Sequence, residues 1–468
     1  MVRKQTKRGV VDFTEGPVFG KMIRFALPIM VTALLQTLYN ASDMIVVGNF
    51  SENGSFAMGA VGACGSLISL CVNLFVGLSS GVGVCVAQSI GAGRHDVARR
   101  YTHTSALISL ICGVALGIFG FVCAEPLLVL MGLPENLLIE AVPYMRAYFV
   151  GIPAMLLYNF LASSLRSAGD SKRPLIFLTI SGFVNVVVNF IMVVCFGMGA
   201  VGVGIATTVA QYLSAAMIVV YMMRAEGVSH LSLKELKIEK HMLIGILQNG
   251  LPVGLQSLVF SISNVLIQST VNSYGDVVVT GTAAASNIEG FIYVAMNSMA
   301  QAVMTIVSQN VGAGKYERIK RVLTLGVIMV VVIGLILGIG INLFGESLLS
   351  IYEPGDSDVA HAIREAGKIR LLLVALPYCL CGMMECISNS LKGMGRAVAS
   401  MVISIFGSCV LRIVWIFAVC PLFPNDIRIL YAAYPITWAV TIAGLVLFLV
   451  KEYKQMIAYR DRNRSLSA

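Results

Sequence analysis

Long stretches without a charged side chain are the feature that most constrains this chain. Residues 53–93 and 174–223 contain no Asp, Glu, Lys, Arg or His, and shorter runs of the same kind follow in the second half of the chain. Only 12% of the 468 residues are charged, against about 25% in ordinary soluble domains. A helix of about 20 apolar residues crosses a bilayer, whereas the strands of a membrane barrel alternate apolar and polar residues. The runs therefore predict an all-α polytopic membrane protein.

Twelve transmembrane helices are expected from these runs and the shorter apolar stretches. A basic segment, residues 3–24, precedes the first of them and could indicate a signal peptide, but the apolar stretch is full-length and lacks a small-residue cleavage site. We interpret it as an uncleaved first helix. The predicted spans are 25–49, 56–88, 102–123, 143–166, 174–196, 202–223, 245–273, 280–309, 321–344, 369–391, 397–420 and 429–450.

The distribution of Lys and Arg predicts the orientation. With the N-terminus inside, 27 of the 33 cationic residues fall in the inside segments, five fall in outside loops, and Arg412 falls within a span. Cytoplasmic loops of membrane proteins carry such an excess of Lys and Arg. We therefore expect both termini in the cytoplasm, and we attribute the net charge of +9 to topology and not to nucleic-acid binding.

The chain contains an internal duplication. Residues 86–94 and 307–315 share a Gln-x-x-Gly-Ala-Gly motif followed by a basic residue, and three further segment pairs match at offsets of 221 to 226 residues. Two similar six-helix lobes related by a pseudo-two-fold axis along the membrane normal are expected. The predicted domains are 1–224 for the N-lobe, 225–241 for a cytoplasmic linker and 242–468 for the C-lobe.

A duplicated six-plus-six arrangement is typical of secondary transporters that work by alternating access. No phosphate-binding Gly-x-x-x-x-Gly-Lys-Ser/Thr motif for an ATP-driven pump occurs. The Gly-x-Gly-x-x-Gly at Gly197 follows an apolar helix, so a tight turn is expected there and not dinucleotide binding. The 11 cysteines show no metal-ligand or disulfide spacing. We expect no enzymatic activity, no cofactor and no metal site.

One polar stripe stands out in the first span. Gln36, Asn40 and Asp43 follow one another at helical spacing, so they lie on one face of the helix. A stripe of this kind must face the protein interior or a wet cavity. Hydrogen bonding between helices would explain Gln36 and Asn40. A carboxylate adds a charge that H⁺, Na⁺ or a cationic substrate can neutralise, so Asp43 is the main candidate for a functional residue.

Other polar residues in the spans are candidates for the same cavity or for helix packing. Asn185, Asn189 and Thr207 are expected beside the first-helix stripe, either as cation ligands or as interhelical hydrogen-bonding groups. Arg412 is expected to be structural, as a partner for one of the acids in the spans. The candidates for a substrate cleft are Gln36 and, in the second half, Gln268, Glu289, Tyr293, Glu385 and Asn389. For Glu289, an interior salt bridge or a hydrogen-bonded acid is the alternative.

These residues resemble the bacterial multidrug and toxic compound extrusion (MATE) family. The resemblance covers nearly the whole chain and rests on Pro28, on Asp43 within Tyr-Asn-Ala-Ser-Asp-Met-Ile-Val-Val-Gly, on the two Gln-x-x-Gly-Ala-Gly motifs and on Leu-Arg-Ser-Ala-Gly-Asp from Leu165. It implies export of amphipathic organic cations in exchange for H⁺ or Na⁺, with Asp43 as the coupling residue. Asn185 and Thr207 match the family's N-lobe site, and Asn189 stands where the family has an acid.

The missing acid makes H⁺ the expected coupling ion. We also expect a monomer in the bacterial cytoplasmic membrane whose partners are the lipid bilayer and small organic cations. A flippase or exporter of a lipid-linked or other endogenous metabolite is the alternative. A cleft for polyanionic head groups should contain several Lys or Arg, whereas Arg412 is the only such residue away from the ends of the predicted spans.

Overall fold

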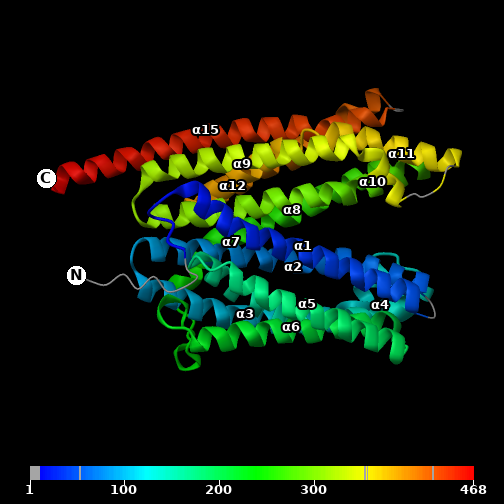
Figure 1. Ribbon diagram of the computed structural model, residues 1–468, viewed down its shortest axis with the longest axis horizontal. Coiled ribbons are helices and arrows are strands. Elements are labelled where there is room, and N and C mark those ends of the chain that lie inside the picture. The colour runs from blue at the N-terminus through cyan, green and yellow to red at the C-terminus, as the bar shows by residue number, and fades with distance from the viewer. Residues whose placement is uncertain (1–10, 52–53, 353–354, 356, 424–425, 468) are drawn as a thin grey trace. The chain divides into compact units, whose positions relative to one another are not determined.

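The structure is a computed structural model that describes residues 11–51, 54–352, 355, 357–423 and 426–467. Helices are the only regular elements in these residues, so the all-α fold class is confirmed. The helices are α1 (Val18–Phe50), α2 (Gly54–Gly91), α3 (His95–Leu130), α4 (Glu135–Ser167), α5 (Lys172–Phe190), η1 (Ile191–Cys195), α6 (Gly199–Arg224), η2 (Gly227–Ser229), η3 (Leu233–Glu235), α7 (Lys240–Asn272), α8 (Asp276–Gly312), α9 (Tyr316–Leu343), α10 (Gly345–Tyr352), α11 (Asp358–Arg370), η4 (Leu371–Ala375), α12 (Tyr378–Gly393), α13 (Ala397–Ser404), η5 (Ile405–Val410), α14 (Leu411–Ala418), η6 (Cys420–Leu422) and α15 (Ile427–Ser467) (Figure 1).

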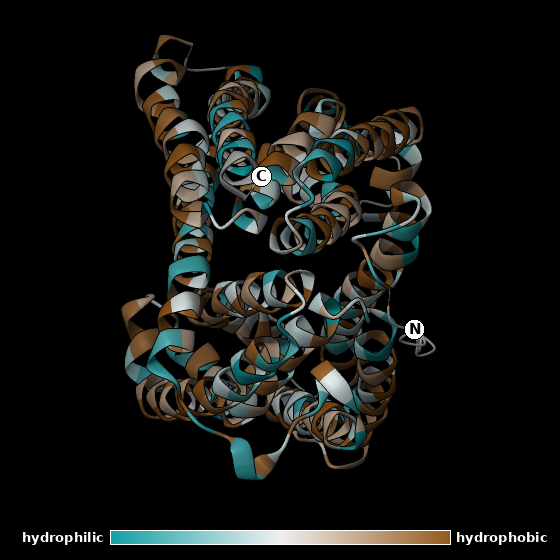
Figure 2. Cartoon of the chain, turned by 90° about the vertical axis from the view of Figure 1, so that its left-hand side faces the viewer, coloured by the Kyte–Doolittle hydropathy of each residue, from teal (hydrophilic) through white to brown (hydrophobic). Residues whose placement is uncertain are grey.

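The helices agree with the predicted spans. In the described residues, eleven helical stretches are long and apolar enough to cross a membrane, and the bent pair Asp358–Ala375 and Tyr378–Gly393 makes a twelfth. Figure 2 shows hydrophobic residues along much of the helices, with hydrophilic residues in several of the segments that connect them. Such helices satisfy their own backbone hydrogen bonds, as lipid requires.

The tenth span differs from its prediction in a way that matters for the site. It was expected to begin at residue 369, which placed Arg370 at the edge of an outside loop. The helix begins at Asp358 instead, and Arg370 is buried. The span bends by 40° between Ala375 and Tyr378, at Leu376–Pro377, because proline cannot continue an α-helix undisturbed.

The chain divides into two compact units whose bounds differ from the predicted halves. Of the described residues, the first unit contains 11, 12 and 27–254, and the second contains 13–26 and those from 255 onward. Helices α1 and α7 therefore each belong to both units. In α1 the change of unit falls next to Pro28, and in α7 it falls next to Pro252.

In the first unit α4 is the central helix, and α2, α3 and α6 pack around it. The start of α7 packs closely on α2 in the same unit. A methyl group on Gly77 would lie 2.3 Å from the Gly254 backbone, and one on Gly81 would lie 2.4 Å from the nitrogen of Gly250. Only glycine allows two helix backbones to approach so closely. This contact explains why the start of α7 groups with the first unit.

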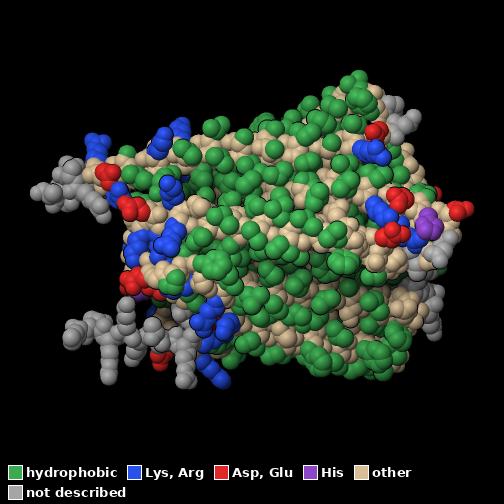
Figure 3. Space-filling model, turned by 45° about the horizontal axis from the view of Figure 1, so that its top comes forward, with side chains coloured by type: hydrophobic (Ala, Val, Ile, Leu, Met, Phe, Trp, Pro, Cys, Tyr) green, Lys and Arg blue, Asp and Glu red, His purple; other side chains and the backbone are tan. Residues whose placement is uncertain are grey.

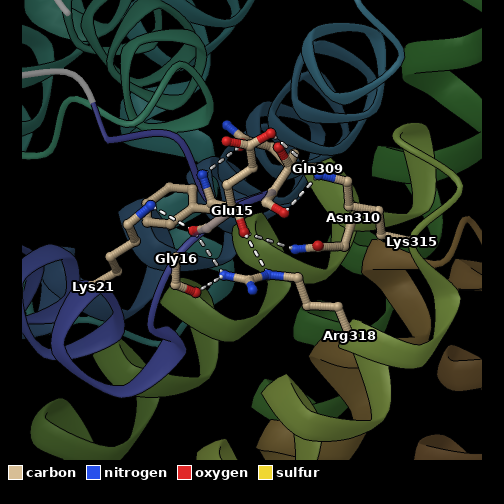
Figure 4. A network of polar contacts seen from close by, with 9 residues as sticks. Glu15, Gly16, Lys21, Gln309, Asn310, Lys315 and Arg318 are labelled. Atoms are coloured by element: carbon tan, nitrogen blue, oxygen red, sulfur yellow. Dashed lines mark hydrogen bonds and ion pairs between the residues drawn. The ribbon is translucent and has the colours of Figure 1, made fainter.

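In the second unit α8 and α12 are the central helices. The α8 helix packs against α9, α11 and α12, and α12 also packs against α15. The segment that precedes α1 is part of this unit. Arg318 donates hydrogen bonds to the carbonyls of Phe13, Glu15 and Gly16, and Lys315 donates to the carbonyl of Thr14 (Figure 4). The second copy of the duplicated motif and the residues after it thus hold the chain at the start of the first helix.

The predicted linker is attached to the first unit along α3. Arg99 pairs with Glu235, and Arg100 pairs with Glu239. The backbone N–H of Ser232 donates to Nε2 of His103 over 2.9 Å. The segment between α6 and α7 therefore follows the surface of α3 instead of forming a free connection.

Charged side chains lie mainly near the ends of the helices. On the face drawn in Figure 3, hydrophobic side chains cover the middle of the helices, and most Lys and Arg side chains gather toward one end. An apolar band between two charged zones is the surface that a bilayer requires of a membrane-spanning protein.

Candidate functional site

A polar cavity in the first unit contains the predicted first-helix stripe. Its volume is about 450 Å³, within the range of about 300–1,000 Å³ that is usual for small-molecule sites. Gln36, Asn40 and Asp43 line it from α1, Asn185 lines it from α5, and Thr207 lines it from α6. The structure thus brings together five of the predicted residues from three helices.

Asp43 is buried, with 9% of its surface exposed, and amide groups surround its carboxylate. Asn189 donates from Nδ2 to Oδ1 of Asp43 over 2.7 Å. The Asn185 side-chain amide has one orientation in which both its nitrogen and its oxygen form hydrogen bonds. In that orientation the Asn185 nitrogen also donates to Oδ1 of Asp43, over 3.1 Å. The Asn185 oxygen then accepts from the Thr207 backbone N–H over 3.3 Å. Asp43, Asn185, Asn189 and Thr207 therefore belong to one hydrogen-bonded cluster.

Among the described residues, the Asp43 carboxylate has no cationic partner. In the part of the chain that the structure describes, no Lys, Arg or His side chain pairs with it. Hydrogen bonds to a charged group contribute about 1.5–3 kcal/mol each, which offsets part of the cost of burying the charge. An isolated buried carboxylate still favours binding a proton or a cation. The cavity is therefore suited to exchange one positively charged ligand for another.

Local backbone geometry helps to place two of the buried polar groups. The π-helical turn η1 directly follows Phe190, one residue after Asn189, and η4 directly follows Arg370. Such turns insert an extra residue into a helix and occur often at functional sites. They change which residues of the span face the protein interior, a change that helical periodicity in the sequence does not predict.

A second polar pocket, of about 340 Å³, lies within the second unit. It contains three of the predicted cleft residues, Gln268, Glu289 and Tyr293. Glu289 forms a bidentate ion pair with Arg370. Nε of Arg370 donates to Oε1 over 3.0 Å, and its Nη2 donates to Oε2 over 2.9 Å. Both side chains are buried, with 4% and 7% of their surfaces exposed. The interior salt bridge that the sequence left open for Glu289 is thus present.

Two further predicted cleft residues lie elsewhere. Glu385 and Asn389 are on α12, and neither lines the unit-2 pocket. The expectation that Arg412 pairs with an acid is wrong. Arg412 lies 4.4 Å above the ring of Tyr434, and its Nη2 donates to the hydroxyl of Thr437 over 3.3 Å. A cation above an aromatic face and a hydroxyl acceptor replace the carboxylate here.

Sequence reasoning missed several residues that line the two sites. Arg370 is one of the five cations that the sequence assigns to outside loops, and the tyrosines of the unit-2 pocket, Tyr378 and Tyr434, are not among the candidates from the sequence. In the first unit, Tyr148 and Gln211 also line the cavity. Arg370 could be identified as a candidate from its position next to an apolar run, because a cation there requires either water or an acidic partner in the protein interior. No group of His, Cys, Asp and Glu suited to a metal ion occurs among the described residues.

Comparisons with known proteins agree with the resemblance found in the sequence. The MatE family matches residues 28–191 and 252–417. The chain is 26% identical over 450 residues to the probable multidrug resistance protein YoeA of Bacillus subtilis, a match that covers 94% of each chain. It is 22% identical over 401 residues to a FAD transporter of Shewanella oneidensis, covering 84% of this chain and 86% of the relative. The fold matches an outward-facing multidrug resistance MATE transporter with a TM-score of 0.88 and 22% identity, covering 97% of this chain and all of the other.

Proposed function

Because the chain belongs to the MATE family of membrane transporters, we propose that it is a proton-coupled antiporter that exports amphipathic organic cations from the cytoplasm. The proposal rests on one observation: the buried Asp43 carboxylate lines a polar cavity, and no cationic side chain in the described part of the chain pairs with it. Gln36, Asn40, Asn185, Asn189 and Thr207 surround it in one cavity or hydrogen-bonded cluster. The names of its multidrug-resistance relatives support the substrate class.

In this mechanism a proton and the exported cation compete for Asp43. A proton that arrives from outside neutralises the carboxylate and releases the bound cation. Loss of that proton to the cytoplasm then restores the charge for the next cation. Moving one uncompensated charge across the membrane costs about 2.3 kcal/mol per 100 mV. Exchange at one carboxylate keeps both loaded states neutral at this site and avoids that cost.

The amides around Asp43 favour H⁺ over Na⁺. Nδ2 of Asn189 faces the carboxylate, so a donor and not an oxygen points at the charge. Oδ1 of the same amide is buried and accepts no hydrogen bond from any of the described residues. A half-turn of this amide would present that oxygen to a protonated Asp43, so one side chain can stabilise both forms of the carboxyl group. A hard cation such as Na⁺ requires several oxygen ligands instead.

The test is efflux of tetramethylrhodamine methyl ester, a fluorescent organic cation, from vesicles in which the pH and Na⁺ gradients are set separately. The wild type should pump when only the pH gradient is present. Asp43→Asn is nearly isosteric and should insert and fold, but it should not pump. Thr37→Ser, a conservative change on an exposed part of the same helix, is the matched control. A folded Asp43→Asn protein with wild-type efflux would contradict the mechanism. Efflux driven by a Na⁺ gradient alone would show that the coupling ion is Na⁺ and not H⁺.

The same proposal places the protein in the bacterial cytoplasmic membrane as a monomer, with both termini in the cytoplasm. The excess of Lys and Arg in the predicted inside segments supports this orientation. A single cysteine at position 235, in a background without the 11 native cysteines, should be inaccessible to an impermeant thiol reagent in intact cells. Labelling there from outside would reverse the orientation.

One observation favours the alternative function, an exporter of an endogenous metabolite. The expectation of a single cation within the spans is wrong, because Arg370 also lies in a buried helix and lines the unit-2 pocket. One relative is named as a transporter of FAD, which is an anion. Uptake of FAD into inverted vesicles that contain the protein distinguishes this function from drug export.

A further inference from the structure

The unit-2 pocket contains a cation that is only partly satisfied. A guanidinium group has five N–H donors, and Glu289 accepts from two of those of Arg370, one on Nε and one on Nη2. No other acceptor within the described residues takes the rest. The side chain is 7% exposed and lines the pocket. Three donors on one buried arginine are thus available to a ligand.

Glu289 itself is poorly suited to bind an organic cation. Both of its carboxylate oxygens accept hydrogen bonds from Arg370, which also neutralises its charge. The cost of removing both ions from water is large, and an apolar pair of the same volume is often as stable. A buried pair that leaves donors unused therefore suggests a role in recognition and not only in stability.

The walls of the pocket are aromatic and amide-bearing. Tyr378 and Tyr434 line it, and both rings pack edge-on against Trp438. The centroid of the Trp438 ring lies 5.3 Å from that of Tyr378 and 5.7 Å from that of Tyr434. The Arg370 guanidinium lies 5.5 Å from the centre of the Tyr434 ring. Asn264 and Gln268 add hydrogen-bonding groups from α7. These surfaces fit a flat aromatic body, and the guanidinium edge fits a planar carboxylate, to which Arg can bind with two parallel hydrogen bonds.

We propose that the unit-2 pocket is a binding site for aromatic carboxylates, in which Arg370 holds the carboxylate on the donors that Glu289 leaves free. This ligand class lies outside the organic cations assigned to the Asp43 cavity. The site depends on neither proton coupling nor transport, so it can be tested by binding alone.

The probes are tetramethylrhodamine, which carries a free carboxylate, and its methyl ester, which differs by esterification of that group. Their binding to the purified full-length protein in detergent is followed by fluorescence anisotropy. The double variant Glu289→Gln, Arg370→Gln removes both charges together, so no unpaired ion remains in the interior. It should weaken binding of the free acid by about tenfold or more and leave the ester nearly unchanged, since charge-assisted hydrogen bonds are roughly twice as strong as neutral ones.

The single variant Glu289→Gln should change the affinity for the free acid in the opposite direction. It leaves Arg370 without a counter-ion, so the free acid should bind more tightly than to the wild type. If Glu289 instead recognised cations, this variant would weaken binding of the ester, and that result would overturn the proposal. Arg428→Gln removes an exposed cation outside the pocket and is the matched control; it should change neither affinity.

A third variant tests the location without disturbing the ion pair. Gly290 lines the pocket, and a methyl group at this residue would meet open space. Gly290→Leu should therefore fold and fill part of the pocket, with loss of free-acid binding. Free-acid binding that survives both Gly290→Leu and the double variant would show that the carboxylate binds elsewhere. Because Asp43 is intact in all these variants, efflux of the ester reports separately on the proposed antiport.

Discussion

The contact between α2 and α7 can be tested with one methyl group. Gly77→Ala would put its Cβ 2.3 Å from both Cα and N of Gly254 and 2.9 Å from the carbonyl carbon of Val253. Non-bonded carbon atoms are most favourably separated by about 3.5–4.0 Å. All the atoms that the new methyl group meets belong to helix backbone, so no side chain can rotate out of its way. The two helices must move apart by more than about 1 Å.

The size of the effect follows from this displacement. A gap of about 0.5–1 Å already removes a quarter to a half of the dispersion attraction between packed atoms, and overpacking costs about 1–3 kcal/mol. Each 1 kcal/mol lowers Tm by about 2–4 °C in a domain of 150–250 residues, so a fall of roughly 2–12 °C is expected.

The assay is thermal unfolding of the detergent-solubilised protein, followed by size-exclusion fluorescence. Gly65→Ala is the matched control, because Gly65 is on the same helix and a methyl group there meets nothing within 4 Å. Alanine is also the better helix former, so the control should be neutral or slightly stabilising. If the two variants unfold at the same temperature, α2 and α7 are not in backbone contact at Gly77 and the reasoning fails.

Two further outcomes concern the segment before α1 and the linker between α6 and α7. Arg318→Ala removes the donors that bind the carbonyls of the segment before α1, so trypsin should cut at Lys21 faster than in the wild type. Lys320→Ala, at an exposed neighbouring cation, is the control and should not change the rate. Equal cleavage rates in the two variants would show that Arg318 does not hold this segment. The Arg99 guanidinium holds the pKa of Glu235 below its usual value, so this ion pair is intact at neutral pH and is lost as the pH falls through the lowered pKa, below about 4.3. Pepsin cleavage of the linker should rise at that step in the wild type and show no step in Arg99→Gln.

The helices could be predicted from the sequence because lipid imposes a simple rule. A chain in hydrocarbon must satisfy its backbone hydrogen bonds within each segment, so a long charge-free run has to be a helix. The Asp43 cluster could also be predicted from the sequence, for a related reason. Asn185 and Asn189 are one turn apart on a helix, and the polar groups of a span must share the interior with other polar groups.

The unit-2 pocket could not be predicted in the same way. Glu289 and Arg370 are separated by 81 residues, and nothing local to either side chain identifies the other. Arg370 follows Arg364 and Lys368 in a charged stretch that the sequence alone suggests is a loop. Only the packing of α11 on α8 shows that this cation is in the interior.

The division of α1 between the two units has a consequence for how the protein is made. Phe13 leaves the ribosome well before its hydrogen-bond partner Gln309, which comes 296 residues later. Translation at about 5–20 residues per second needs roughly 15–60 s for that stretch. Throughout this interval the start of the first helix is in the membrane without the helices that will cover it. During synthesis the second unit thus depends on a segment made long before the rest of it, so the start of α1 must keep this contact available until α8 has been made.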